Sequence, residues 1–167
     1  MKWQDENVRY LTKQMQLNYI ESELKNYYWH LAQWKIYDDE QKRLEMEYES
    51  LLESPRISGS IIKMPQGSGE KSPWQLDMSG EIAELEEKKN IEKQYLDQVD
   101  RWMKVCTHSQ GKMVKQYVMI QQCKDVTKAA RETGFSEDNV KKSRERVLNK
   151  IFSAYFLKTV HSVTENQ

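Results

Sequence analysis

The sequence has few residues that interrupt or cross-link a chain. It contains 3 Pro, 6 Gly and 2 Cys in 167 residues. No stretch approaches the roughly 18 uncharged apolar residues that a membrane helix needs, which predicts a protein without a membrane segment. The first ten residues, MKWQDENVRY, lack the apolar core of a signal peptide. We therefore expect a cytoplasmic location, with Cys106 and Cys123 reduced and packed rather than bridged.

No excess of one charge marks the chain as a whole, because 26 Lys and Arg balance 26 Asp and Glu. Only 38% of the residues are apolar and 31% are charged, which favours an elongated, helix-rich protein with a thin core. The charges are unevenly placed. Up to residue 110 there are 15 basic and 20 acidic residues, and beyond it 11 basic and 6 acidic, so the halves carry −5 and +5.

Proline and glycine are concentrated in one segment. All three prolines and four of the six glycines lie between residues 55 and 80, which predicts a flexible linker over 54–79. Residues 1–53 contain neither type, and their apolar positions recur at helical steps of three and four. This pattern predicts a long helical interaction or oligomerisation region, and it leaves open whether one helix continues past Asp38 or two meet there. The apolar positions are Leu17, Ile20, Leu24, Tyr27, Leu31, Trp34, Tyr37, Leu44, Tyr48 and Leu51.

A second long helix is predicted over 80–107. Its inward positions again follow steps of three and four, but charged residues occupy two of them, Lys89 and Glu92. Such interruptions favour a helix pairing with a limited register over a purely apolar coiled coil. The two stripes must be covered by each other, by a second copy in a homodimer, or by a partner. The positions are Ile82, Leu85, Lys89, Glu92, Leu96, Val99, Met103 and Cys106.

Residues 108–167 are expected to form a helix-turn-helix module. A helix is predicted around 112–123, then a second one, VTKAARET, begun by Asp125 as N-cap and ended at Gly134. Ser136 is the expected N-cap of a last helix, which starts at Glu137. A small residue at Ala130 would let the two helices cross closely. The inner face of the last helix is predicted to hold Val140, Val147, Leu148, Ile151 and Tyr155, with Ser143 as a polar exception.

The opposite face of this last helix carries residue types that contact DNA. Helical geometry directs Asn139, Lys142, Arg146 and Asn149 outward together. Base contacts are expected from Asn139, Lys142 and Arg146, and phosphate contacts from Lys128, Lys141 and Lys142. Ser136 completes the candidate DNA-binding set. The alternative is that this polar face contacts only water and binds no ligand.

The stretch VTKAARETGFSEDNVKKSRERVLNKI resembles the helix-turn-helix of sigma-factor region 4, through a small-residue helix, the turn Gly134, Phe135 and Ser136, and a longer recognition helix. The wider layout is similar to that of small phage and prophage regulators of the ArpU and RinA kind. It consists of a helical N-terminal part, the linker SPRISGSIIKMPQGSGEKSPW, the acidic helix EIAELEEKKN and this module. The resemblance implies a late-gene transcriptional regulator in a bacterial host cell, acting on double-stranded promoter DNA and through RNA polymerase.

Three other kinds of site are set aside. The segment GSGEKS has Glu70 where a phosphate loop needs Gly, and the Cys106, His108 and Cys123 group lacks a fourth ligand for zinc. The aromatic residues at 27–37 are expected to fill a helix interface.

We expect no enzyme activity and no cofactor. Two rival functions remain: a small terminase-like packaging protein, which would form a ring, and a helical interaction module that binds RNA polymerase or a host factor.

Overall fold

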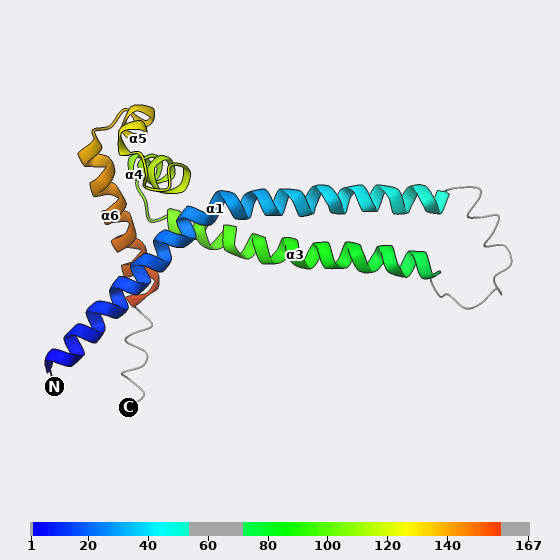
Figure 1. The fold of residues 1–167 in the computed structure, drawn as a ribbon, viewed down its shortest axis with the longest axis horizontal. Coiled ribbons are helices and arrows are strands. Elements are labelled where there is room, and N and C mark those ends of the chain that lie inside the picture. Colours follow the sequence, from blue (N-terminus) through cyan, green and yellow to red (C-terminus); the bar gives the residue numbers. More distant parts are fainter. Residues whose placement is uncertain (1, 54–71, 158–167) are drawn as a thin grey trace. The chain divides into compact units, whose positions relative to one another are not determined.

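The computed structural model describes residues 2–53 and 72–157, with side chains from residue 12 onward (Figure 1). The described residues form helices and no strands, which confirms the all-α prediction. The helices are α1 (Lys2–Glu53), α3 (Pro73–Met103), α4 (His108–Val114), the π-helix η1 (Lys115–Ile120), α5 (Val126–Thr133) and α6 (Glu137–Tyr155).

The first region is one helix, because α1 continues through Asp38 without a break. The side chain of Asp38 lies 2.6 Å from the ammonium of Lys42, one turn further along the same helix. It also accepts a hydrogen bond from Lys89 of α3 at 2.8 Å. The carboxylate of Asp38 is thus compatible with a continuous helix, because two cations neutralise it: Lys42, four residues later in α1, and Lys89 on α3.

The predicted linker is wrong at its C-terminal end, because α3 begins at Pro73 and residues 73–79 are helical. Proline suits the first position of a helix, where no hydrogen-bond donor is needed. The N–H of Ser72 donates to the side chain of Gln75 at 2.8 Å, and its carbonyl accepts from Leu76, which starts the helix. Gly80 is tolerated inside α3. The rest of the predicted linker, 54–71, lies outside the described residues.

The second long helix also ends earlier than predicted, at Met103 rather than residue 107. Its last turn tightens, because Val105 and Cys106 donate their N–H groups to the carbonyls three residues back. Thr107 then caps α4 with a reciprocal pair of bonds to Gln110, in which the Thr107 hydroxyl accepts from the Gln110 N–H and the Gln110 amide oxygen accepts from the Thr107 N–H. This capping box fixes the start of the next helix.

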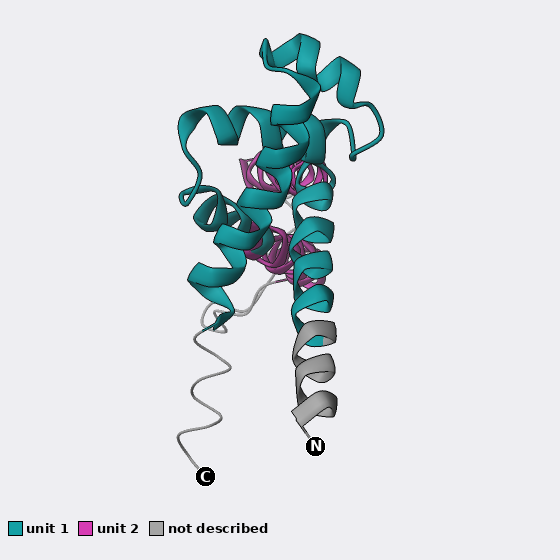
Figure 2. Cartoon of the chain, turned by 90° about the vertical axis from the view of Figure 1, so that its left-hand side faces the viewer, with its two compact units in different colours: residues 1–29, 95–167 teal, residues 30–94 magenta. Residues whose placement is uncertain are grey.

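The chain forms two compact units that do not follow the predicted boundaries (Figure 2). Residues 1–29 and 95–167 make unit 1, and residues 30–94 make unit 2. The first part of α1 therefore shares a core with the C-terminal helices. Apolar residues of α1, α3, the α4–η1 segment and α6 meet in the core of unit 1, and its fully buried members include Ile20, Leu24, Val99, Val114, Val118, Val147 and Ile151.

Unit 2 is a pair of helical segments from α1 and α3 with a thin core. Among its described residues, Leu44 is the one buried hydrophobic side chain, and the other inward apolar residues are half-buried. Polar contacts replace apolar packing: Lys89 donates to Asp38 at 2.8 Å and to Gln41 at 2.7 Å, and His30 Nδ1 lies 2.5 Å from Glu92. These pairs occupy the two charged positions of the α3 stripe, as expected for a pairing whose register is limited.

None of the described helices combines the length and the apolar character needed to cross a bilayer.

Candidate nucleic-acid interface

The segment α5–turn–α6 is fixed at three points. The carboxylate of Asp125 accepts the N–H of Lys128 at 2.9 Å, Gly134 ends α5 with a φ of 76°, and the hydroxyl of Ser136 accepts the N–H of Asn139 at 3.2 Å. All three residues were predicted in these roles, which are therefore confirmed. Aspartate and serine satisfy orphan N–H groups at helix starts, and glycine adopts the left-handed conformation without a steric penalty.

A small apolar cluster holds α4, α5 and α6 together. It consists of Met113, Ala129 and Val140, which are 6%, 0% and 1% exposed. The buried small residue of α5 is therefore Ala129, and the prediction for Ala130 is wrong by one position, since Ala130 only borders the cluster. Val140 anchors α6 as predicted.

The inner face of α6 is largely as predicted. Val140, Val147, Leu148 and Ile151 are buried, but Tyr155 is 43% exposed and its hydroxyl donates to the carbonyl of Arg101 at 3.0 Å. Ser143 points inward with 3% exposure, and its hydroxyl lies 3.4 Å from the sulfur of Met113. A polar residue fits this position because Met113 offers a weak acceptor.

Every predicted DNA-binding residue is exposed. Lys128 lies on α5, Ser136 is the N-cap of α6, and the others lie on α6; the full set is Lys128, Ser136, Asn139, Lys141, Lys142 and Arg146. Asn139, Lys142, Arg146 and Asn149 follow helical steps on one side of α6, away from the buried Val140, Val147 and Ile151. The hydroxyl oxygen of Ser136 is occupied as a cap, so only its O–H remains to contact a ligand.

One carboxylate lies on the same face and pairs with a candidate cation. Asp138 is 2.8 Å from the ammonium of Lys142, and both side chains are exposed. The hydrogen bond from Lys142, its charge and that of Lys141 hold the pKa of Asp138 below its ordinary value. At neutral pH, Asp138 therefore stays charged and cancels part of the positive field at the start of α6.

The basic face continues beyond the predicted residues. Arg146, Asn149 and Lys150 line a shallow groove of about 710 Å³ with Val105, Glu145, Ser153 and Ala154. The ammonium of Lys150 donates to the side chain of Gln110 on α4 at 2.8 Å, which holds it beside Arg146. Sequence reasoning missed Lys150, although its position four residues after Arg146 places both on one side of the helix.

A half-buried ion pair connects α6 to the first helix. Arg144 donates twice to the carboxylate of Glu21 on α1, at 3.1 and 2.6 Å, and the thiol of Cys123 lies 3.3 Å from the same carboxylate. Burial raises the pKa of Glu21, but the bonds from Arg144 and Cys123 and the charges of Arg144 and Lys25 outweigh burial and lower it. Arg144 is thus an anchoring residue and not a member of the exposed face.

The remaining predicted groups do not form a chemical site. Burial is the main cause that raises the pKa of both Cys106 and Cys123, so neither thiol is activated. Within residues 12–53 and 72–157, no three His, Cys, Asp or Glu side chains are grouped to hold a metal ion. Of the aromatic residues at 27–37, Tyr27 and Tyr28 pack against the core of unit 1, and Trp29 is 58% exposed.

Comparison with known proteins gives no relative: no family model, no curated protein and no solved structure matches this chain.

Proposed function

We propose that the chain is a sequence-specific, double-stranded DNA-binding protein of the phage type that regulates transcription, and that α5 and α6 act as a helix-turn-helix. The observation that carries this proposal is the division of α6 into two faces. Val140, Ser143 and Val147 are buried, whereas Asn139, Lys142 and Arg146 are exposed together. An exposed helix face with asparagine, lysine and arginine has the side chains that contact base edges in a major groove.

The charge of this part of the chain supports the proposal. Beyond residue 110, 11 basic residues stand against 6 acidic ones. Lys128 on α5 and Lys141 on α6 are exposed beside the reading face, where lysines can neutralise phosphates. Arg146 is the proposed base-reading residue, and it lines the shallow groove together with Asn149 and Lys150. In this proposal the long helices bring two copies together, and a polymerase contact makes the protein an activator of late genes.

The test uses the full chain and a duplex chosen by selection from a random library. Salt-titrated affinity is measured for the wild type and for Lys142→Ala/Arg146→Ala. Removing a base-reading arginine lowers affinity for the selected site by about 1–3 kcal/mol, and each lost phosphate contact reduces the slope of log affinity against log salt by about 0.9.

A matched control removes two positive charges elsewhere. Lys35 and Lys93 are exposed on unit 2, so Lys35→Ala/Lys93→Ala changes the net charge equally without touching α6. We expect the control to bind the selected duplex as the wild type does. Equal affinity and salt slope for the α6 variant and the wild type would exclude this face as the DNA-binding surface.

A further inference from the structure

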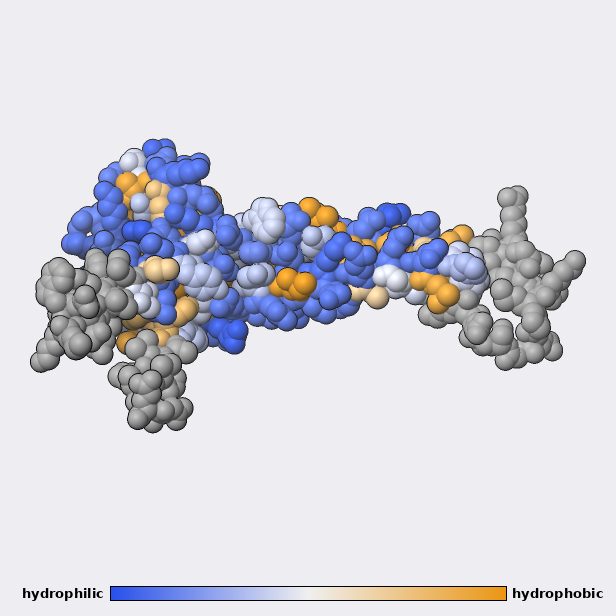
Figure 3. Space-filling view, turned by 60° about the horizontal axis from the view of Figure 1, so that its bottom comes forward, coloured by the Kyte–Doolittle hydropathy of each residue, from blue (hydrophilic) through white to orange (hydrophobic). Residues whose placement is uncertain are grey.

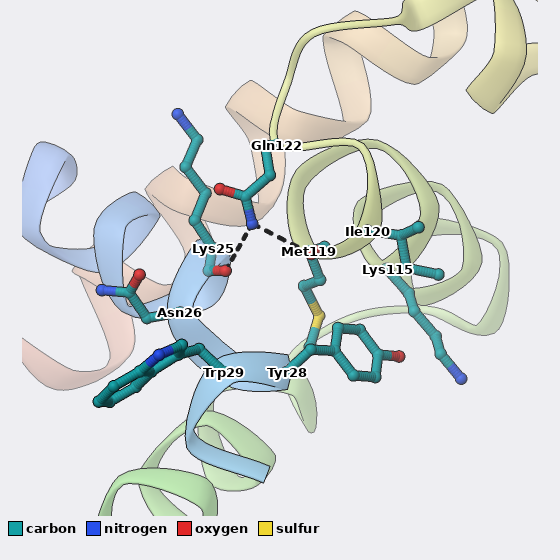
Figure 4. A pocket seen from close by; sticks show the side chains of 8 residues that line it. All are labelled: Lys25, Asn26, Tyr28, Trp29, Lys115, Met119, Ile120 and Gln122. Carbon is teal, nitrogen blue, oxygen red and sulfur yellow. Dashed lines mark hydrogen bonds between the residues drawn. The ribbon is translucent and has the colours of Figure 1, made fainter. Parts of the chain in front are cut away.

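A second exposed site lies in unit 1 and shares no residue with the α6 face. It is an open pocket of about 770 Å³ between α1 and η1 (Figure 4). In the close view, Tyr28 of α1 lies below Met119 and points towards Lys115 and Ile120 of η1, whereas Trp29 points the other way from α1, and Gln122 lies at the upper side of the pocket. The lining residues are Lys25, Asn26, Tyr28, Trp29, Lys115, Met119, Ile120 and Gln122.

The turn that follows η1 has an unusual backbone conformation. Gln122 and Cys123 have φ angles of 57° and 58°, which non-glycine residues rarely adopt. The amide of Gln122 donates to the carbonyl of Lys25 at 2.7 Å and to that of Met119 at 3.4 Å, and so ties η1 to α1. The two walls are therefore fixed relative to each other before anything binds, which reduces the entropy lost on binding.

The pocket offers apolar surface in a positively charged setting. Trp29 is 58% and Ile120 46% exposed, and the lining has two lysines and no carboxylate. The ammonium of Lys25 lies 3.3 Å from Glu21, whereas no ion pair of Lys115 is found within the described residues. Aromatic residues and methionine are enriched at protein interfaces. A ligand that fits has a bulky apolar side chain next to carboxylates, and the aliphatic Met119 and Ile120 favour a protein segment over stacked bases.

Unit 2 of the same chain has this complementary chemistry. Residues 30–94 contain 9 basic and 14 acidic residues, whereas residues 1–29 and 95–167 contain 17 and 12, so the units carry −5 and +5. The acidic excess is strongest in the first half of α3, where residues 73–87 hold five acidic and no basic residues. Figure 3 shows isolated apolar patches on a hydrophilic surface.

The first turns of α3 combine an apolar anchor with these charges. Leu76 is 58% exposed, and Asp77, Glu81, Glu84 and Glu87 are exposed on the same segment. Gly80 lies one turn after Leu76, and a Cβ built there meets nothing within 4 Å. Without a side chain at this position, the helix surface beside Leu76 is low enough for another surface to approach closely.

We propose that the α1–η1 pocket binds the first half of α3 from a second copy of this chain. Leu76 of that copy enters the pocket between Tyr28 and Ile120, and its Asp77 and Glu81 face Lys115. This contact gives the self-association of the proposed function a specific surface, whereas the DNA contacts of the α6 face do not depend on it.

The experiment measures self-association of the full chain by sedimentation velocity over a concentration series. We expect association that weakens between about 50 mM and about 500 mM NaCl, because salt screens charged pairs. Lys115→Glu and Ile120→Glu each weaken association about tenfold or more, since a like charge or a buried unpaired carboxylate opposes docking. The matched control is Lys124→Glu, the same charge reversal at an exposed lysine outside the pocket lining, which leaves association unchanged.

A charge exchange tests the partner surface. Asp77→Lys/Glu81→Lys abolishes self-association of the variant, and mixing it with Lys115→Glu restores association between the two chains. Circular dichroism verifies that each variant keeps the helical content of the wild type. The proposal is overturned if the wild type is monomeric at every concentration, if Lys124→Glu weakens association as much as Lys115→Glu, or if the mixture does not associate. A monomer whose Lys115→Glu variant loses binding of an oligo-dT strand assigns the pocket to nucleic acid instead.

Failure of this proposal and failure of the proposed function are separable. Loss of duplex binding in Lys142→Ala/Arg146→Ala concerns only α6, and it is measured on a chain whose pocket is intact.

Discussion

At the scale of single residues, one ion pair connects the beginning of the chain to the proposed DNA-binding helix. Glu21 and Arg144 are 123 positions apart, and their side chains are 12% and 31% exposed. Arg144 fixes α6 on one side, so that Lys142 and Arg146 extend on the other. The pair makes the first helix a structural part of the C-terminal module, although nothing in the sequence around Glu21 indicates such a contact.

Glu21→Gln should destabilise unit 1. Replacing the carboxylate leaves Arg144 without its charge partner, and we expect a loss of about 1–2 kcal/mol at pH 7, towards the lower value because water reaches Arg144. The folded-state pKa of Glu21 lies below its ordinary value of 4.5, so its stabilisation is present above that value and disappears as the pH falls through the lowered pKa.

Urea denaturation at pH 7 and at decreasing pH checks this prediction. The difference between wild type and Glu21→Gln should shrink towards zero in acid. Glu132→Gln, at an exposed position of α5, is the control and should change little at either pH. A difference that is independent of pH would show that the ion pair is not its source.

Asp138→Asn should strengthen DNA binding if α6 is the reading helix. The substitution releases Lys142 from its 2.8 Å ion pair and removes a carboxylate that repels phosphate. We expect a severalfold gain in affinity at low salt, a salt slope that is steeper by up to about 0.9, and a smaller gain at high salt. Fluorescence anisotropy with the selected duplex measures both quantities. Unchanged affinity would mean that the start of α6 does not approach DNA.

At the scale of elements, two glycines have opposite roles that substitution distinguishes. Gly134 has a φ of 76°, which strains any other residue, whereas Gly80 is an ordinary position inside α3. Gly134→Ala should destabilise by about 1 kcal/mol because alanine disfavours the left-handed conformation. Gly80→Ala should stabilise by about 0.5–1 kcal/mol because glycine weakens a helix interior. Denaturation of dilute protein at high salt compares the two, and effects of the same sign would contradict this assignment.

Element boundaries were predictable where a local signal sets them. Asp125, Gly134 and Ser136 act within four residues of their own positions, so their roles follow from the sequence. The start of α3 was misplaced because proline is found both at the first position of a helix and after its end. Two bonds decide for a helix start here: the Ser72 N–H donates to the Gln75 side chain, and the Leu76 N–H donates to the Ser72 carbonyl. The choice between Ala129 and Ala130 depends on the rotation of α5 against Met113, which is a tertiary contact.

At the scale of the whole molecule, apolar burial is distributed unequally between the two units. Of the 16 buried hydrophobic residues in the described part of the chain, only Leu44 belongs to residues 30–94. The periodic stripes correctly indicated which side of α1 and α3 faces inward. They could not indicate that the same helix contributes to a thick core before residue 29 and to a thin, polar one after it. That difference depends on α6 and the α4–η1 segment, which pack against the first part of α1 from more than 80 positions away.

Local stability should follow this distribution. The backbone of unit 2 is protected by few buried apolar contacts and by polar pairs such as Lys89 with Asp38, so its helices should open at lower free energy than those of unit 1. Hydrogen exchange of dilute full chain at high salt, followed by mass spectrometry, should label peptides from 30–53 and 81–94 at least about tenfold faster than α6 peptides around Val147. Lys89→Met removes the ammonium between Asp38 and Gln41 and should further accelerate exchange in unit 2 alone. Equal protection of both units would mean that polar pairing stabilises unit 2 as strongly as the apolar core stabilises unit 1.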